Sequence, residues 1–142
     1  MRYLGLDLGT KTLGVAITDK TGTIARVLKV VRFNNEDYEF ALNEVLKLIE
    51  EYEIKKIALG LPKNMNNSCG FASDRSLNFK KLLETKTSVP IYLIDERLST
   101  TEAENILINA DVSREKRKKV IDGVAAQIIL ETFMKMEENI HE

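Results

Sequence analysis

Apolar residues alternate with polar or small residues through most of the first 33 positions, a period of two that predicts β-strands. The runs are Tyr3 to Leu8, Gly14 to Asp19 and Thr23 to Phe33, and turns rich in Gly, Thr and Lys separate them. Strands joined by such short turns pair as antiparallel hairpins. The start of the chain is therefore predicted to fold as a three-stranded meander.

The spacing of apolar residues becomes helical after Asn34-Asn35, which we expect to cap a helix. Apolar positions then recur from Tyr38 to Tyr52 at helical intervals, which predicts an amphipathic helix. Further segments follow in order: the strand Lys56 to Leu61, the polar loop Pro62 to Gly70, a helix with Ala72, Phe79, Leu82 and Leu83 facing inward, and the strand Val89 to Asp95.

The rest of the chain is predicted to be helical. Ser99 and Glu102 have the spacing of a capping box, which opens one helix, and a polar break at 111–113 leads into a last helix that ends near Met136. Strands followed by alternating helices and strands indicate an α/β layer architecture, in which crossover helices join the later strands. Since the chain contains no repeat or linker, we expect residues 1–142 to form one domain.

Three acidic residues stand where this architecture brings chain segments together. Asp7 lies near the end of the first strand, Glu96 follows the last strand, and Asp122 begins the apolar stripe of the final helix, which continues through Ala125 and Ala126. A carboxylate that faces a core is costly unless a partner compensates its charge. A cap or a surface charge explains each acid alone, but the three together predict a shared divalent cation.

Strand alternation places Asp7 on the same face as Tyr3 and Gly5. The small Gly5 leaves room for a ligand beside the carboxylate. The same alternation sends Asp95 and Glu96 to opposite faces, so only one of them shares a site with Asp7. We interpret Asp95 as structural.

Composition narrows the class of protein. With 142 residues, of which 44% are hydrophobic, the chain has enough apolar material for a single core. It has no apolar run near the roughly 18 residues that a membrane-spanning helix needs, so we predict a soluble, cytoplasmic protein without membrane contact. One cysteine, Cys69, and one histidine, His141, exclude an internal disulfide and a zinc site built from that pair. A bound metal must therefore have oxygen ligands, which favours Mg²⁺ or Mn²⁺.

The formal net charge is only −1, but basic residues are concentrated in the run Arg114 to Lys119, which has five cations in six positions. Such a run is typical of a phosphate-binding strip, although a solvated helix start explains it as well. Next to an acidic site we favour nucleic acid as the partner. The cations expected to contact phosphates are Lys11, Arg97, Arg114, Lys116, Arg117 and Lys118, of which Lys11 and Arg97 are equally compatible with surface charges.

Four ordered motifs run through the chain: Gly5-Leu-Asp7-Leu-Gly9-Thr10-Lys11-Thr-Leu-Gly14-Val-Ala, Gly60-Leu-Pro62-Lys-Asn-Met65-Asn, Asp95-Glu96-Arg97-Leu-Ser-Thr-Thr and Lys116-Arg117-Lys118-Lys-Val-Ile-Asp122-Gly-Val-Ala-Ala126. They closely resemble the motifs of the YqgF family, also called RuvX, whose members are ribonuclease H-like proteins. The resemblance extends over nearly the whole chain.

The resemblance implies a ribonuclease H-like fold, which is a five-stranded mixed sheet with the first three strands antiparallel and helices on its flanks. It also implies a metal-dependent nuclease that matures the 5′ end of pre-16S ribosomal RNA, or a Holliday junction resolvase that acts on branched DNA. The acidic positions of the family match Asp7, Glu96 and Asp122, which would be both metal ligands and catalytic residues. We expect Asp7 to be the central ligand.

Two rival functions are compatible with these residues. Asp7-Leu-Gly9-Thr10 also resembles the phosphate loop of actin-like ATPases and sugar kinases, although those proteins enclose the nucleotide between two such domains. Gly9-Thr10 would either offer backbone N–H groups to a phosphate or form a tight hairpin that requires a positive φ at Gly9. The second rival is a non-catalytic RNA-binding module, which typically lacks the acids. RNA or branched DNA as the substrate, and a monomer or a homodimer as the assembly, are left open.

Overall fold

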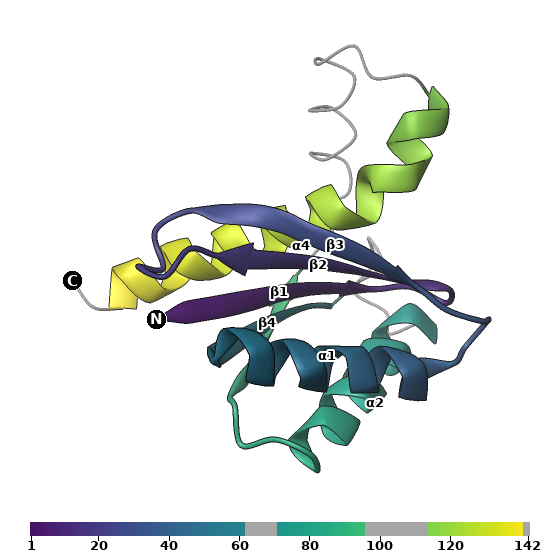
Figure 1. The fold of residues 1–142 in the computed structure, drawn as a ribbon, viewed down its shortest axis with the longest axis horizontal. Coiled ribbons are helices and arrows are strands. Elements are labelled where there is room, and N and C mark those ends of the chain that lie inside the picture. Colours follow the sequence, from purple (N-terminus) through teal and green to yellow (C-terminus); the bar gives the residue numbers. More distant parts are fainter. Residues whose placement is uncertain (62–70, 96–113, 141–142) are drawn as a thin grey trace.

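The computed structural model describes residues 1–61, 71–95 and 114–140, and for residues 71, 72, 114–122 and 138–140 it describes the backbone alone (Figure 1). The elements are β1 (Arg2–Leu8), β2 (Thr12–Thr18), β3 (Ala25–Arg32), α1 (Tyr38–Tyr52), β4 (Ile54–Leu61), α2 (Phe71–Glu84), β5 (Ile91–Asp95) and α4 (Arg114–Ile140). No helix within these ranges is both long enough and apolar enough to cross a bilayer. The predicted helix that opens at Ser99 lies outside the described residues.

The five strands form one mixed sheet in the order β3-β2-β1-β4-β5, with β1 in the middle. β1, β2 and β3 pair antiparallel, which confirms the predicted meander. β4 pairs parallel to β1, and β5 pairs parallel to β4, so each of these strands is reached through a crossover helix. As a result, the carboxyl ends of β1, β4 and β5 meet at one edge of the sheet, which we call the carboxyl edge.

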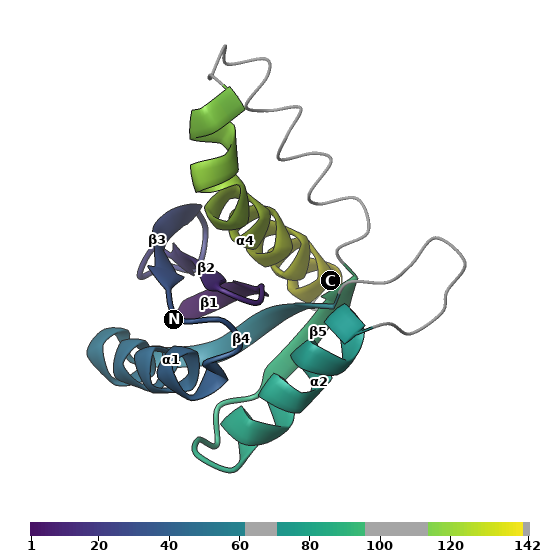
Figure 2. The same cartoon turned by 90° about the vertical axis from the view of Figure 1, so that its right-hand side faces the viewer.

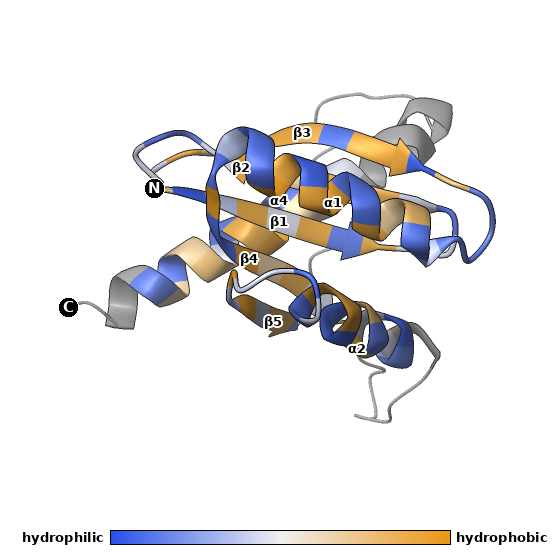
Figure 3. Ribbon diagram, turned by 60° about the horizontal axis from the view of Figure 1, so that its bottom comes forward, coloured by the Kyte–Doolittle hydropathy of each residue, from blue (hydrophilic) through white to orange (hydrophobic). Residues whose placement is uncertain are grey.

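Helices cover the two faces of the sheet unequally (Figure 2). α1 and α2 lie on one face and α4 crosses the other. Hydrophobic residues dominate β1 and β4, whereas α1 and α2 alternate hydrophilic and hydrophobic turns (Figure 3). On the α1/α2 face the core is built from large aliphatic and aromatic side chains, which include Leu4, Leu6, Leu13, Val15, Ile17, Val45, Ile57, Leu59, Phe79 and Leu83. This face supplies most of the apolar burial.

The α4 face is lined by small residues, so the helix backbone lies directly on the sheet. A Cβ atom added to Gly5 would stand 2.7 Å from both the carbonyl oxygen of Ala126 and the Cβ of Leu130. From Ala125 onward the predicted stripe of α4 is confirmed, because Ala125 and Ala126, and further along the helix Ile129 and Phe133, are each at most 2% exposed. These contacts fix the depth at which α4 packs.

Three details of the predicted helices are wrong. The N-cap of α1 is Asp37, whose side chain accepts a hydrogen bond from the Phe40 N–H, and not Asn34-Asn35. The helix begins later because Glu36 adopts a φ of 61° and donates its N–H to the Thr10 carbonyl, which holds the preceding segment in a turn. Leu82 is 45% exposed, because the buried stripe of α2 runs through Ser76, Phe79 and Leu83 and places position 82 at its border. α4 also extends past Met136 to Ile140.

Candidate functional site

Asp7 lies near the carboxyl end of the central strand and is only 9% exposed. Tyr3, four residues earlier on the same side of β1, packs edge to face on Phe133 of α4, with ring centroids 5.7 Å apart. Gly5 meets the backbone of the same helix. The predicted strand face of Tyr3, Gly5 and Asp7 is therefore confirmed, and the carboxylate faces the layer that contains α4.

Glycines stand beside Asp7 on both neighbouring strands. Gly14 of β2 is its direct partner, and Gly60 of β4 follows immediately after the Leu59 that pairs with Leu6. Ala16 and Ala58, two positions away in these strands, belong to the α4-side core, so alternation puts both glycines on the face of Asp7. Neither glycine places a side chain beside the carboxylate at these two strand positions. This arrangement fits a hard divalent cation, which takes carboxylate oxygens and needs space for additional oxygen ligands.

The acid at the end of β5, Asp95, lies on the other face of the sheet from Asp7, as the contacts of its neighbours show. Tyr92 stacks near Phe133 at 5.0 Å between centroids, and Ile94 belongs to the α4-side core, whereas Leu93 packs with the opposite core. Asp95 is therefore on the α1/α2 face, where its side chain is exposed. This placement agrees with the interpretation that Asp95 is not a partner of Asp7. Glu96 and Arg97 lie outside the described residues, and their roles stay predictions.

Asp122 lies in α4 one helical turn before Ala126. Along the helix from Phe133 to Ala126, the contacts move along β1 from Tyr3 to Gly5, so helix and strand run in opposite directions. The side chain of Asp122 is not described. Among the described side chains no group of three acidic, cysteine or histidine residues is close enough to hold a metal, and of the predicted triad only the side chain of Asp7 is described.

The turn between β1 and β2 is fixed by backbone hydrogen bonds. The Gly9 N–H donates to the Thr12 carbonyl over 2.7 Å, and the carbonyls of Thr10 and Lys11 accept from the N–H groups of Glu36 and Phe33. Among the described glycines only Gly22 has a positive φ. The positive φ predicted for Gly9 is therefore wrong, and its N–H group is already used within the turn. A phosphate contact of the Thr10 N–H group stays a prediction. The side chain of Lys11 is exposed on this turn, which lies at the carboxyl edge.

Arg75 of α2 is a residue of this edge that the sequence did not indicate. Its side chain is half-buried, and its Nη1 donates a hydrogen bond to the Leu8 carbonyl over 3.4 Å. A single arginine in a polar helix has no pattern that separates it from surface charges. Only the hydrogen bond to the Leu8 carbonyl shows that it lies at the end of β1, next to Asp7 in the chain.

The predicted basic run forms the beginning of α4, because the helix starts at Arg114. The amino end of a helix carries a partial positive charge, so cations in its first turns are unfavourable for helix stability. The run therefore has no stabilising role through the helix dipole. Phosphate contacts of Arg114, Lys116, Arg117 and Lys118, and the alternative of a solvated helix start, both stay predictions.

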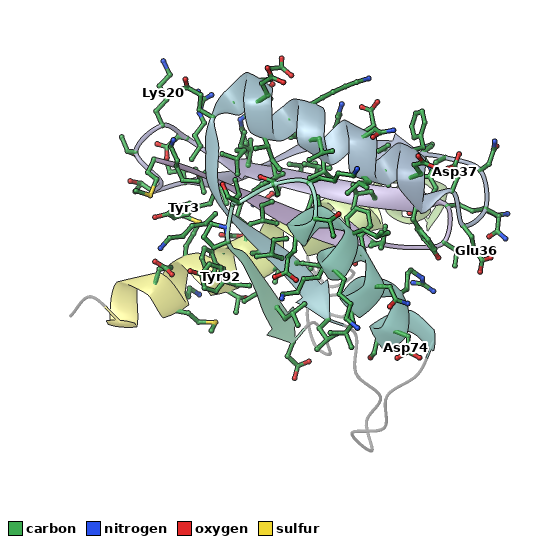
Figure 4. All side chains as sticks on the ribbon, turned by 90° about the horizontal axis from the view of Figure 1, so that it is seen from below. Tyr3, Lys20, Glu36, Asp37, Asp74 and Tyr92 are labelled. Carbon is green, nitrogen blue, oxygen red and sulfur yellow. The ribbon has the colours of Figure 1, made fainter. Side chains whose placement is uncertain are left out.

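An ion pair lies on the α4 face at the other edge of the sheet, where β1, β4 and β5 begin. Lys56 Nζ lies 2.6 Å from Glu137 Oε2, and the two side chains are 23% and 14% exposed. Tyr3 and Tyr92 lie near each other beside α4 (Figure 4), with ring centroids 5.8 and 5.9 Å from the same Nζ. The hydrogen bond to Glu137 raises the pKa of Lys56 above its usual 10.5. This pair fastens the carboxyl-terminal half of α4 to the sheet, far from the carboxyl edge.

Comparison with known proteins agrees with this architecture. The chain matches the model of the RuvX family, described as Holliday junction resolvase, over residues 1–136. A relative from Bacillus subtilis (strain 168), named "Putative pre-16S rRNA nuclease", is 51% identical over 134 residues, which are 94% of this chain and 97% of the relative.

Two solved structures share the fold. T. thermophilus RuvC in complex with Holliday junction substrate matches with a TM-score of 0.63 at 16% identity, over 96% of each chain. The Fowlpox virus resolvase in complex with substrate Holliday junction DNA matches with a TM-score of 0.59 at 14% identity, over 96% of this chain and 98% of that one. The expected ribonuclease H-like fold is confirmed. Since the family model and the relative each span nearly the whole chain, this protein belongs to the RuvX family.

Proposed function

We propose that this protein is a divalent-metal-dependent nuclease that hydrolyses phosphodiester bonds in precursor 16S ribosomal RNA. The observation that carries the proposal is the buried Asp7 carboxylate, which lies between Gly14 and Gly60 where the parallel strands of the sheet end. The relatives named as pre-16S rRNA nucleases support the reaction and the substrate. Maturation of a ribosomal RNA precursor would place the protein in the cytoplasm.

Asp7, Glu96 and Asp122 are the residues proposed to hold Mg²⁺ or Mn²⁺. Strand residues rise about 3.3 Å each and helix residues about 1.5 Å, so the step from Gly5 to Asp7 matches the helical turn from Ala126 back to Asp122. This register supports a position for Asp122 at the level of Asp7. If alternation in the last strand continues past Ile94, Glu96 joins the same face.

The bound cations would supply an activated water and stabilise the leaving oxygen. The protein's own part is to hold three carboxylates at fixed positions and to bind the phosphates around the cleaved bond. Lys11, exposed on the turn after β1, is proposed to neutralise one phosphate. The remaining candidates for phosphate contacts are Arg97, Arg114, Lys116, Arg117 and Lys118.

Resolution of branched DNA is the second candidate function. The description of the RuvX family as Holliday junction resolvase favours it. Paired cuts in a four-way junction require two active sites related by a two-fold axis, so this function predicts a homodimer, whereas a single cut in RNA needs only a monomer. The mass of the protein bound to each substrate separates the two assemblies.

The decisive experiment offers the purified chain both substrates side by side. We expect the protein to cleave a precursor RNA spanning the 5′ end of 16S rRNA in Mg²⁺ or Mn²⁺, and to be inactive in EDTA. Asp7→Asn is the matched variant, which should bind the RNA and not cleave it. Cleavage of the four-way junction alone would favour the second function, and metal-independent or Asp7-independent cleavage would refute the proposed site.

The two rivals predict different results in the same preparation. A non-catalytic RNA-binding module binds the RNA and leaves it intact at every metal concentration. An ATP-binding protein shows heat of binding when titrated with Mg²⁺-ATP, which the proposed nuclease does not. Either result in place of cleavage would overturn the proposal.

A further inference from the structure

Arg75 lies at the carboxyl edge and has no role in the proposed catalytic group. α2 begins at this edge, and Asp74 next to Arg75 lies at the same end of the molecule as Glu36 and Asp37 (Figure 4). The Nη1 of Arg75 donates to the carbonyl of Leu8, the residue that directly follows Asp7 in β1. The guanidinium therefore lies beside the candidate site although it comes from the opposite face of the sheet.

The charge of Arg75 is poorly compensated within the described protein. Its side chain is half-buried, and none of the ion pairs formed among the described residues includes it. A guanidinium has five N–H donors, and the Leu8 carbonyl is a neutral acceptor that takes one of them over a long 3.4 Å. A partly buried charge with only a neutral partner is unfavourable unless an anion completes its surroundings.

We propose that Arg75 binds a phosphate of the nucleic acid strand adjacent to the phosphate that is cleaved, an inference that rests on the proposed nuclease function. The planar guanidinium suits phosphate because it offers two parallel N–H donors. The hydrogen bond to Leu8 holds the group in place before the substrate arrives, which lowers the entropy lost on binding. Lys11, on the turn that follows Leu8, gives the edge a second cation.

A purely structural role for Arg75, in which it only anchors the end of β1, makes different predictions for two variants. Arg75→Gln keeps an amide N–H for the Leu8 carbonyl but has no charge. Arg75→Lys keeps the charge but lacks the planar pair of donors. Lys81→Ala is the matched control, because Lys81 is an exposed cation on the same helix about 9 Å further from the edge.

Binding of each variant to the precursor RNA is measured in EDTA over a range of salt concentrations, and cleavage is measured in Mg²⁺. Arg75→Gln should weaken binding about tenfold and flatten the slope of log affinity against log salt by about 0.7, the value for one contact to a single strand. It should raise KM more than it lowers kcat. Arg75→Lys should keep the parent slope, and Lys81→Ala should change none of these quantities.

An unchanged salt slope in folded Arg75→Gln would overturn this inference and leave the nuclease function standing. The same conclusion follows if Arg75→Lys loses as much slope as Arg75→Gln, because charge would then not explain the effect. A parent protein that neither binds nor cleaves the RNA would refute the proposed function and the role of Arg75 together.

Discussion

The two faces of the sheet are made from alternate residues of the same strands, but their side chains differ sharply. In β1, Leu4, Leu6 and Leu8 face α1 and α2 and are at most 4% exposed. The residues between them, Gly5 and Asp7, face the layer of α4. One face is thus lined by large aliphatic side chains, and the other by a glycine and a carboxylate.

The difference separates stability from function. Each buried leucine contributes about 1.5–3 kcal/mol of apolar transfer free energy, so the α1/α2 face supplies the driving force for folding. The α4 face contributes less burial for each residue but lets a helix backbone approach the sheet. Its small residues also leave space around Asp7 at the carboxyl edge. Substitutions on neighbouring residues of β1 should therefore have effects of different kinds.

The largest effect is expected for Asp7→Asn, which should reduce metal-dependent cleavage by more than about 100-fold, because even the outer partners of metal ligands contribute 10 to 100-fold. Stability should equal or exceed that of the parent, since removing one charge from a site proposed to hold three carboxylates would relieve repulsion in the metal-free protein. Cleavage rates and thermal denaturation of the same samples test both statements. A well-folded variant with parent activity would show that Asp7 is not a ligand.

Leu6→Ala, one residue away on the other face, should show the reverse. Leu6 is 0% exposed, and its truncation should destabilise the protein by about 2–5 kcal/mol through lost burial and a cavity. Urea denaturation measures this loss. At a temperature where the variant is folded, cleavage per folded molecule should stay near that of the parent. A specific loss of activity would mean that the two faces are not independent.

Two glycine substitutions sharpen the comparison within the α4 face. Gly5→Ala would bring a methyl group 2.7 Å from the Ala126 carbonyl oxygen and the Leu130 Cβ, so the helix must move, at a cost of about 1–3 kcal/mol. Gly123→Ala would place its methyl 2.9 Å from Val27 Cγ1, and Val27 is 37% exposed on an edge strand and can yield. The gain in helix propensity of about 1 kcal/mol should offset that contact.

Activity separates these two variants further. Gly5→Ala should lose more cleavage than its instability explains, because it displaces the helix that carries Asp122. Gly123→Ala should keep most of the parent activity at low temperature. Equal activity in both variants would argue that the depth of α4 does not position a metal ligand.

Local patterns predicted this division of the faces, and long-range contacts explain what was missed. The face of Asp7 followed from strand alternation between Tyr3 and Leu8, which depends only on neighbouring residues. The N-cap of α1 was predicted too early because the turn before it depends on a hydrogen bond between Glu36 and Thr10, a contact between segments distant in sequence.

The residues around Asp7 could likewise be identified only from contacts between segments distant in sequence. Gly14 and Gly60 flank Asp7 only after the register of three strands is known. Arg75 joins the edge through a hydrogen bond to a residue 67 positions away, which no local pattern indicates. The motifs made Asp7, Glu96 and Asp122 candidates as a group, and for all three the role in metal binding is still a prediction.

A smaller effect is expected for the basic run at the beginning of α4. Replacing Lys116 and Lys118 with Ala should flatten the salt dependence of RNA binding by about 0.7 for each lost phosphate contact. Thermal stability should hold or rise slightly, because cations near the amino end of a helix oppose its dipole. Titrations at several salt concentrations, with Lys81→Ala as the control, measure the slope. An unchanged slope would identify the run as a solvated helix start.

The smallest effect should come from the ion pair between Lys56 and Glu137, which lies on the α4 face at the edge where β1 and β4 begin. Because Glu137 raises the pKa of Lys56 above 10.5 in the folded protein, the pair stabilises fully below about pH 10.5 and loses this contribution as pH rises through the raised value. Glu137→Gln should therefore reduce the alkaline loss of stability by about 1 kcal/mol or less.

Glu84→Gln, which removes the exposed pair with Lys80, is the control and should change nothing measurable. Denaturation at pH 9 to about 11.5 tests the difference, and neither variant should change cleavage at neutral pH, since both pairs lie away from the carboxyl edge. Reduced neutral cleavage in Glu137→Gln alone would show instead that fastening this end of α4 positions its other end.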